Sequence, residues 1–86
     1  MKLNKNFIPH ITDDESLLAA TADAPFSGVI RGNKTTGLIF QLLTHDTDRD
    51  TVVAELHSRF DAPEGKIEAD VDKIIAQLRK IGALDE

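Results

Sequence analysis

The order of short apolar runs and helical patterns predicts an α+β fold, in which three short N-terminal antiparallel strands precede a three-helix bundle. Up to about residue 32, apolar residues come in short runs bounded by turn-forming residues. Further along, they recur at the three- and four-residue spacing of amphipathic helices. The 86 residues suffice for a single domain, which we expect to span residues 1–86 with an N-terminal tail at residues 1–6.

Three strands are expected in the first third of the chain. Residues 7–12 form the first strand, and Pro9 places it at a sheet edge or a bulge because proline cannot donate a ladder hydrogen bond. Residues 15–21 form a second strand that pairs with the first as a hairpin. A loop at residues 22–27 then leads to the third strand, at residues 28–31.

The first expected helix begins after Asn33, which is a favourable N-cap residue, and runs to about Leu43. Apolar residues cover more than half of its circumference, so we expect it to be buried in the middle of the domain. Gly37 inside this helix costs about 1 kcal/mol relative to alanine. It therefore indicates either a close backbone contact or simple tolerance near the first turn.

Two amphipathic helices are expected to follow. The first starts at Thr47, where Asp50 three residues later resembles a capping box, and ends at Phe60. The second runs over residues 66–81 and ends at Gly82, a typical residue just after a helix. The residues that we expect these two helices to bury are Val52, Val53, Leu56, Phe60, Ile67, Val71, Ile74, Ile75, Leu78 and Ile81.

The composition excludes several classes of site and partner. The chain has no cysteine, which rules out disulfides, thiolate metal sites and cysteine nucleophiles. The net charge is −5, and residues 45–86 hold eleven acidic and six basic side chains, so nucleic acid is a disfavoured partner. No apolar run reaches the roughly 18 residues of a membrane span, and no signal peptide is recognisable. We therefore expect a cytoplasmic protein with no membrane partner.

No pattern of residues indicates catalysis. The histidines His10, His45 and His57 lack the spacing of metal ligands, and we expect His57 to pack at the boundary of the core. No serine stands in a nucleophile motif, and residues 28–32 lack the Lys-Ser/Thr ending of a phosphate-binding loop. We therefore expect no catalytic residue, no metal site and no cofactor.

The third strand and the last helix offer a candidate interaction surface. An exposed strand edge presents unpaired N–H and C=O groups to a further strand. On the last helix, Asp70, Lys73 and Gln77 border one side of the apolar stripe, whereas Glu68 and Arg79 lie toward the other. A solvated helix face would carry the same polar residues, so the residues alone leave both interpretations open.

Three segments resemble the PqqD family, which is named for its role in making the quinone cofactor PQQ. They are residues 28–43, with the run GVIRGNKTTGLIFQLL, residues 47–60, and residues 69–84, with the run ADVDKIIAQLRKIGAL. These are similar to the family's strand and Glu-Thr-Gly run, its acidic-capped helix, and its Asp-Val helix that ends in glycine. The chain departs from the family pattern at Phe40, where tryptophan is common, and at Lys34, where glutamate is usual.

The resemblance implies a winged-helix-like domain that acts as a peptide chaperone. Such a domain binds the leader segment of a precursor peptide as an added strand and delivers it to a radical S-adenosylmethionine enzyme. The peptide-binding residues implied by the resemblance are Val29, Ile30 and Arg31 of the third strand and Asp70, Lys73, Ile74 and Gln77 of the last helix. Which flank of that helix faces the strand is left open by the sequence.

A winged-helix transcription factor is the alternative from a different class, because its numbers of strands and helices are compatible. A recognition helix presents arginine and lysine to DNA. The last helix instead mixes Glu68, Asp70 and Asp72 with its basic residues, which disfavours this alternative. The sequence also leaves a monomer and a strand-exchanged dimer both open.

Overall fold

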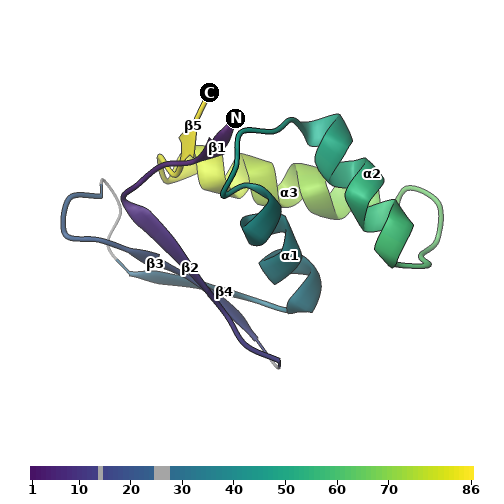
Figure 1. Ribbon diagram of the computed structural model, residues 1–86, viewed down its shortest axis with the longest axis horizontal. Coiled ribbons are helices and arrows are strands. Elements are labelled where there is room, and N and C mark those ends of the chain that lie inside the picture. Colours follow the sequence, from purple (N-terminus) through teal and green to yellow (C-terminus); the bar gives the residue numbers. More distant parts are fainter. Residues whose placement is uncertain (14, 25–27) are drawn as a thin grey trace.

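The computed structural model describes residues 1–13, 15–24 and 28–86, so residues 25–27 of the expected loop lie outside the described part of the chain. The predicted α+β fold, with three antiparallel strands followed by three helices, is confirmed. The main elements are β2 (Phe7–Ile11), β3 (Ser16–Ala20), β4 (Val29–Gly32), α1 (Lys34–Leu42), α2 (Arg49–Arg59) and α3 (Lys66–Lys80). Figure 1 shows the sheet on one side, α2 and α3 on the other, and α1 between them.

The sheet has the strand order β2-β3-β4, and both of its pairings are antiparallel. Leu18 in the central strand lies opposite Pro9 on one side and Ile30 on the other, and its side chain is buried. Because opposed residues share a face, Ile30 belongs to the inner face, whereas Val29 and Arg31 belong to the outer face. The inner face of β4 therefore turns Ile30 toward the core, and the outer face carries Val29 and Arg31.

Helix α1 is the centre of the core. It contacts all three strands of the sheet and α2. Ile39 and Phe40 are at most 1% exposed, and Leu43, just after the helix, is fully buried. Burial of each such side chain contributes about 1.5–3 kcal/mol relative to an exposed position. The expectation of a helix buried in the middle of the domain is confirmed.

Gly37 allows α1 to approach β3 closely. A Cβ atom at this position would lie only 2.8 Å from the Cβ of Ser16, which is too short for a relaxed contact. The Ser16 hydroxyl, itself buried, donates a hydrogen bond to the carbonyl of Asn33 at 3.0 Å. Of the two explanations for this glycine, close backbone packing is the one that the structure supports.

The chain ends form a second, two-stranded ribbon that the sequence analysis did not predict. Strands β1 (Lys2–Leu3) and β5 (Leu84–Asp85) pair antiparallel, and Figure 1 shows the two termini side by side. Residues 1–6 were expected to form a tail, but Leu3 is a buried member of the core. The amide of Leu3 also donates to the carbonyl of Leu43, which fixes the ribbon to the end of α1.

Helix α2 differs from expectation at both ends. Its N-cap is Asp48, whose carboxylate accepts from the amide of Thr51 at 2.7 Å, and not Thr47. The reason is that the backbone of Thr47 is bound to Met1 on both its N–H and its C=O. Phe60 was expected to be buried but is 38% exposed, because the backbone has become extended there and the side chain leaves the helical face.

Candidate functional site

A groove runs between β4 and α3 and encloses about 260 Å³. No residue of β3 lines it, so it follows the side of β4 that faces away from the rest of the sheet. The residues that line it are Ile30, Arg31, Asn33, Thr35, Thr36, Lys66, Asp70, Lys73, Ile74 and Gln77. The groove therefore joins the end of the third strand, the first turn of α1 and one flank of α3.

The free edge of β4 offers backbone hydrogen-bonding groups at alternate residues. The amide of Ala20 donates to the carbonyl of Gly28, which fixes the phase of the ladder between β3 and β4. Hydrogen-bonded pairs alternate with non-bonded pairs along an antiparallel ladder. Val29 and Arg31 therefore direct their N–H and C=O groups away from β3, where β4 has no partner strand among the described residues.

The opposite wall of the groove is one stripe of α3. Its residues, Lys66, Asp70, Lys73, Ile74 and Gln77, recur at spacings of three and four, which places them on one side of the helix. The adjacent stripe, Ile67, Val71, Ile75 and Leu78, is buried in the core. The structure thus answers which flank of α3 faces β4, a point that periodicity alone left open.

The groove has an apolar floor and a charged rim. Ile30 and Ile74 are half-buried and pack against the core from the two sides of the groove. On the rim, the Lys66 ammonium donates to the Asp70 carboxylate at 3.0 Å, one helical turn away. An extended segment lying here would find apolar contact below it and charged groups beside it.

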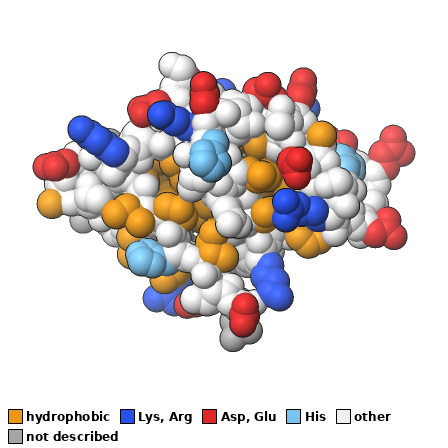
Figure 2. Space-filling view, viewed as in Figure 1, with side chains coloured by type: hydrophobic (Ala, Val, Ile, Leu, Met, Phe, Trp, Pro, Cys, Tyr) orange, Lys and Arg blue, Asp and Glu red, His pale blue; other side chains and the backbone are white. Residues whose placement is uncertain are grey.

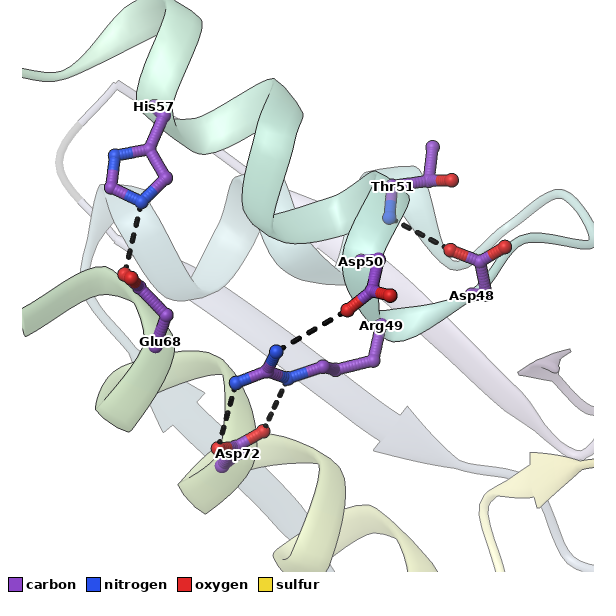
Figure 3. Close-up of polar contacts among 7 residues, drawn as sticks. All are labelled: Asp48, Arg49, Asp50, Thr51, His57, Glu68 and Asp72. Atoms are coloured by element: carbon purple, nitrogen blue, oxygen red, sulfur yellow. Dashed lines mark hydrogen bonds and ion pairs between the residues drawn. The ribbon is translucent and has the colours of Figure 1, made fainter. Parts of the chain in front are cut away.

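Polar contacts between α2 and α3 hold the groove wall in place. Arg49, at the start of α2, donates two hydrogen bonds to Asp72 of α3, at 2.9 and 3.1 Å (Figure 3). The hydrogen bonds from Arg49 hold the pKa of Asp72 below its ordinary value. Asp72 immediately precedes the groove residue Lys73. This bidentate contact therefore holds α3 in position close to the residues that line the groove.

A second contact ties the other half of α2 to α3. His57 was expected at the boundary of the core, but its side chain is 45% exposed and its ring lies 2.9 Å from the Glu68 carboxylate (Figure 3). The pKa of Glu68 is lowered by a backbone hydrogen bond and by the contact with His57. Glu68 therefore faces α2, on the flank of α3 away from the groove.

A larger hollow of about 590 Å³ lies on that far flank, but its cations are already paired. Arg49 binds Asp72, and Arg79 binds Glu86 with a shortest N–O distance of 2.6 Å. No strand edge of the three-stranded sheet borders this hollow. It is larger than the groove beside β4 but offers fewer unsatisfied groups to a ligand.

The structure gathers six of the seven residues expected in a peptide site around one groove. The exception is Val29, whose side chain is 52% exposed on the outer face, although its backbone points to the free edge. The sequence analysis did not single out Asn33, Thr35, Thr36 and Lys66 as groove residues. Lys66 could have been found, because it stands one turn before Asp70 on the same stripe.

Other kinds of site find no support in the described ranges, 1–13, 15–24 and 28–86. No group of three potential metal-ligating side chains occurs there. None of the helices in this part of the chain has the length and apolar character needed to cross a membrane. Figure 2 shows basic and acidic side chains interspersed around the visible face, without a continuous basic stripe.

Two solved structures share this arrangement of strands and helices. The structure "TbiB1 in Complex with the TbiA(beta) Leader Peptide" matches with a TM-score of 0.79 and 16% identity, covering 99% of this chain and 95% of that chain. "Lasso peptide synthetase B1 complexed with the leader peptide" matches with a TM-score of 0.72 and 21% identity, covering 95% and 93%. At these identities the likeness establishes the fold, whereas the curated proteins provide no match.

These likenesses define the class as a small α+β domain with a three-stranded sheet that leads into three helices. The family described as "Coenzyme PQQ synthesis protein D (PqqD)" matches residues 15–84. The chain therefore belongs to the PqqD family, as the resemblance of its three segments predicted. The matched range includes β4, α1 and the whole of α3, and thus every element that lines the groove.

Proposed function

We propose that this protein is a non-catalytic peptide chaperone that binds the leader segment of a precursor peptide. The leader adds as a strand to the free edge of β4 and packs its side chains against α3. The protein then presents the precursor to a radical S-adenosylmethionine enzyme, which performs the chemistry. This role is the one that membership of the PqqD family implies.

The observation that carries the proposal is an unpaired strand edge that opens into a groove. Strand addition gives affinity through main-chain hydrogen bonds, and pockets for alternate side chains give specificity. Both requirements are met beside β4, where Val29 and Arg31 offer the backbone groups and Ile74 offers apolar surface. The two structurally similar proteins are described as complexes with leader peptides, which supports the same use of this fold.

Isothermal titration calorimetry with the leader segment of a precursor peptide encoded beside this protein tests the proposal. We expect one peptide per protein, a Kd in the micromolar range or below, and a negative heat-capacity change from apolar burial. A peptide of the same composition in scrambled order is the matched control. Equal affinity for both peptides, or no binding of any neighbouring leader at millimolar concentration, would contradict the proposal.

The proposal assigns no chemical step to this chain. Mass spectrometry of the peptide after incubation with the protein alone should show an unchanged mass. The expectations of a cytoplasmic location and of a monomer or a strand-exchanged dimer stay predictions. Sedimentation with and without the leader peptide would separate the two oligomeric states.

A further inference from the structure

We propose that the groove selects an extended segment in which an acidic residue stands at odd spacing from an apolar residue. Arg31 binds the carboxylate, Lys73 adds positive charge to the same groove, and Ile30 and Ile74 contact the apolar side chain. This inference rests on the proposed function and adds the chemical class of peptide that the groove accepts.

The charge of the groove is opposite to that of the chain. Its lining includes three basic side chains, Arg31, Lys66 and Lys73, and a single acidic one, Asp70. The chain as a whole carries a net charge of −5. A groove lined by one sign of charge attracts the opposite sign, here a carboxylate.

Two of these cations are available to a ligand. Lys66 is engaged with Asp70, which leaves Arg31 and Lys73 to determine the sign of the rim. No described acidic side chain lies within ion-pair distance of either of them. By contrast, Arg49, Arg59 and Arg79 each have a carboxylate partner, so Arg31 at the groove is the arginine without an ion pair among the described residues.

The two cations come from opposite walls. Arg31 extends from β4 and Lys73 from α3, and both line the same volume of about 260 Å³. The Arg31 guanidinium can bind a carboxylate through two parallel hydrogen bonds, and the Lys73 ammonium adds a second positive charge to the same groove. Ion pairs at exposed positions contribute modestly to the binding affinity. They contribute more to the selection of one peptide sequence over another.

The spacing between acid and apolar residue follows from the pleat of the sheet. Successive side chains of a strand point to opposite faces. Ile30 stands on the inner face of β4 and Arg31 on the outer face. A strand added beside β4 continues both faces, so its apolar residue meets Ile30 and its acidic residue meets Arg31 only when they are an odd number of positions apart.

Selection from a displayed library of random 12-residue peptides tests this inference without knowledge of the natural leader. We expect the wild-type protein to enrich peptides that carry Asp or Glu one or three positions from Leu, Ile, Val or Phe. The variant Arg31→Gln/Lys73→Gln should enrich apolar residues without the acid. The control variant Lys5→Gln/Lys80→Gln removes the same charge from positions outside the groove and should select as the wild type does.

An enriched peptide, synthesised with its acid and with the matching amide, gives the quantitative test. The acidic form should bind the wild type about twofold to fivefold more tightly than the amide form, and the double variant should bind both equally. Raising the salt concentration from 0.05 to 0.5 M should remove most of this preference.

Two negative results have different meanings. Enrichment of peptides without acid, or equal acid enrichment by wild type and Arg31→Gln/Lys73→Gln, would overturn the inference and leave strand addition intact. Failure of the wild type to enrich any peptide, while the protein remains folded by circular dichroism, would overturn the proposed function and the inference with it.

Discussion

The two edges of the three-stranded sheet are opposite in character. On β4, the backbone groups of Val29 and Arg31 face outward beside a groove. On β2, the backbone groups that point away from β3 belong to Phe7, Pro9 and Ile11, because the bonded pairs between β2 and β3 fall on the alternate positions. The amide of Phe7 is taken by the carbonyl of Asn4, and Pro9 has no amide hydrogen.

The difference shows how a small sheet directs strand addition to one side. A proline at an outward-facing position closes an edge to a further strand, which natural sheets use against aggregation. The edge of β4 has no such residue, and it alone borders a groove that α3 completes. The protein therefore blocks one edge and leaves the other available.

Among the changes that test this difference between the two edges, Val29→Pro should have the largest effect on peptide binding. It removes an outward amide from β4 while leaving the pairing with β3, which uses the neighbouring residues. We expect leader-peptide affinity to fall about tenfold to a hundredfold, because one main-chain bond is lost and its partner is left unsatisfied. Calorimetry measures the loss, and Val29→Ala should bind nearly as the wild type does. Unchanged affinity of Val29→Pro would place the peptide elsewhere.

Ile74→Ala tests the contribution of the α3 wall of the groove, which lies beside the edge of β4. The side chain is half-buried in the groove, so its truncation removes apolar contact with the peptide while the fully buried stripe of α3 stays intact. We expect affinity to fall about threefold to tenfold, as measured by fluorescence anisotropy with a labelled leader. A matched change on a distant exposed apolar residue, Phe60→Ala, should leave affinity unchanged; equal losses would argue against a specific wall.

Pro9→Val tests the blocked edge. It restores an amide at the outward-facing position of β2 and gives the strand a residue with high β-propensity. We expect weak, concentration-dependent self-association in sedimentation experiments, with leader-peptide binding at β4 preserved. If Pro9→Val remains as monomeric as the wild type at millimolar concentration, the proline does not guard this edge.

The smallest effect is expected from Asp72→Asn, which weakens the link between α2 and the groove wall. The pKa of Asp72 in the folded protein lies below its ordinary value of 3.8 because Arg49 donates hydrogen bonds to it. The stability that this contact provides is therefore present above about pH 4 and is lost as the pH falls further. We expect the variant to melt slightly below the wild type at pH 7 and by a smaller margin at pH 3, by differential scanning calorimetry. An equal difference at both pH values would assign the effect to packing.

The sequence predicted those parts of the fold that local patterns determine. The 3.6-residue period of Ile67, Val71, Ile75 and Leu78 gives α3 and its buried stripe, and the hairpin follows from two short apolar runs around a turn. The pairing of β1 with β5 has no such pattern, because each strand has two residues and they meet across the whole length of the chain. The N-cap of α2 was misplaced because a contact with Met1, 46 residues away, decides between two suitable residues.

The candidate site was predictable in its residues but not in its geometry. Family resemblance named both flanking elements, whereas periodicity could not tell which flank of α3 faces β4, because both flanks border the apolar stripe equally. In the structure, Glu68 and Asp72 face α2, and the Lys73 flank is left to face the sheet. Likewise, it is the phase of the β3–β4 ladder that directs the backbone N–H and C=O groups of Val29 and Arg31 away from β3.

The most direct test of strand addition is amide hydrogen exchange of the two sheet edges, measured by NMR with and without the leader peptide. The account predicts that the amides of Val29 and Arg31 become strongly protected in the complex, while the amide of Ile11 on β2 keeps its exchange rate. Tight binding without added protection at Val29 and Arg31, or with protection on β2 instead, would contradict it.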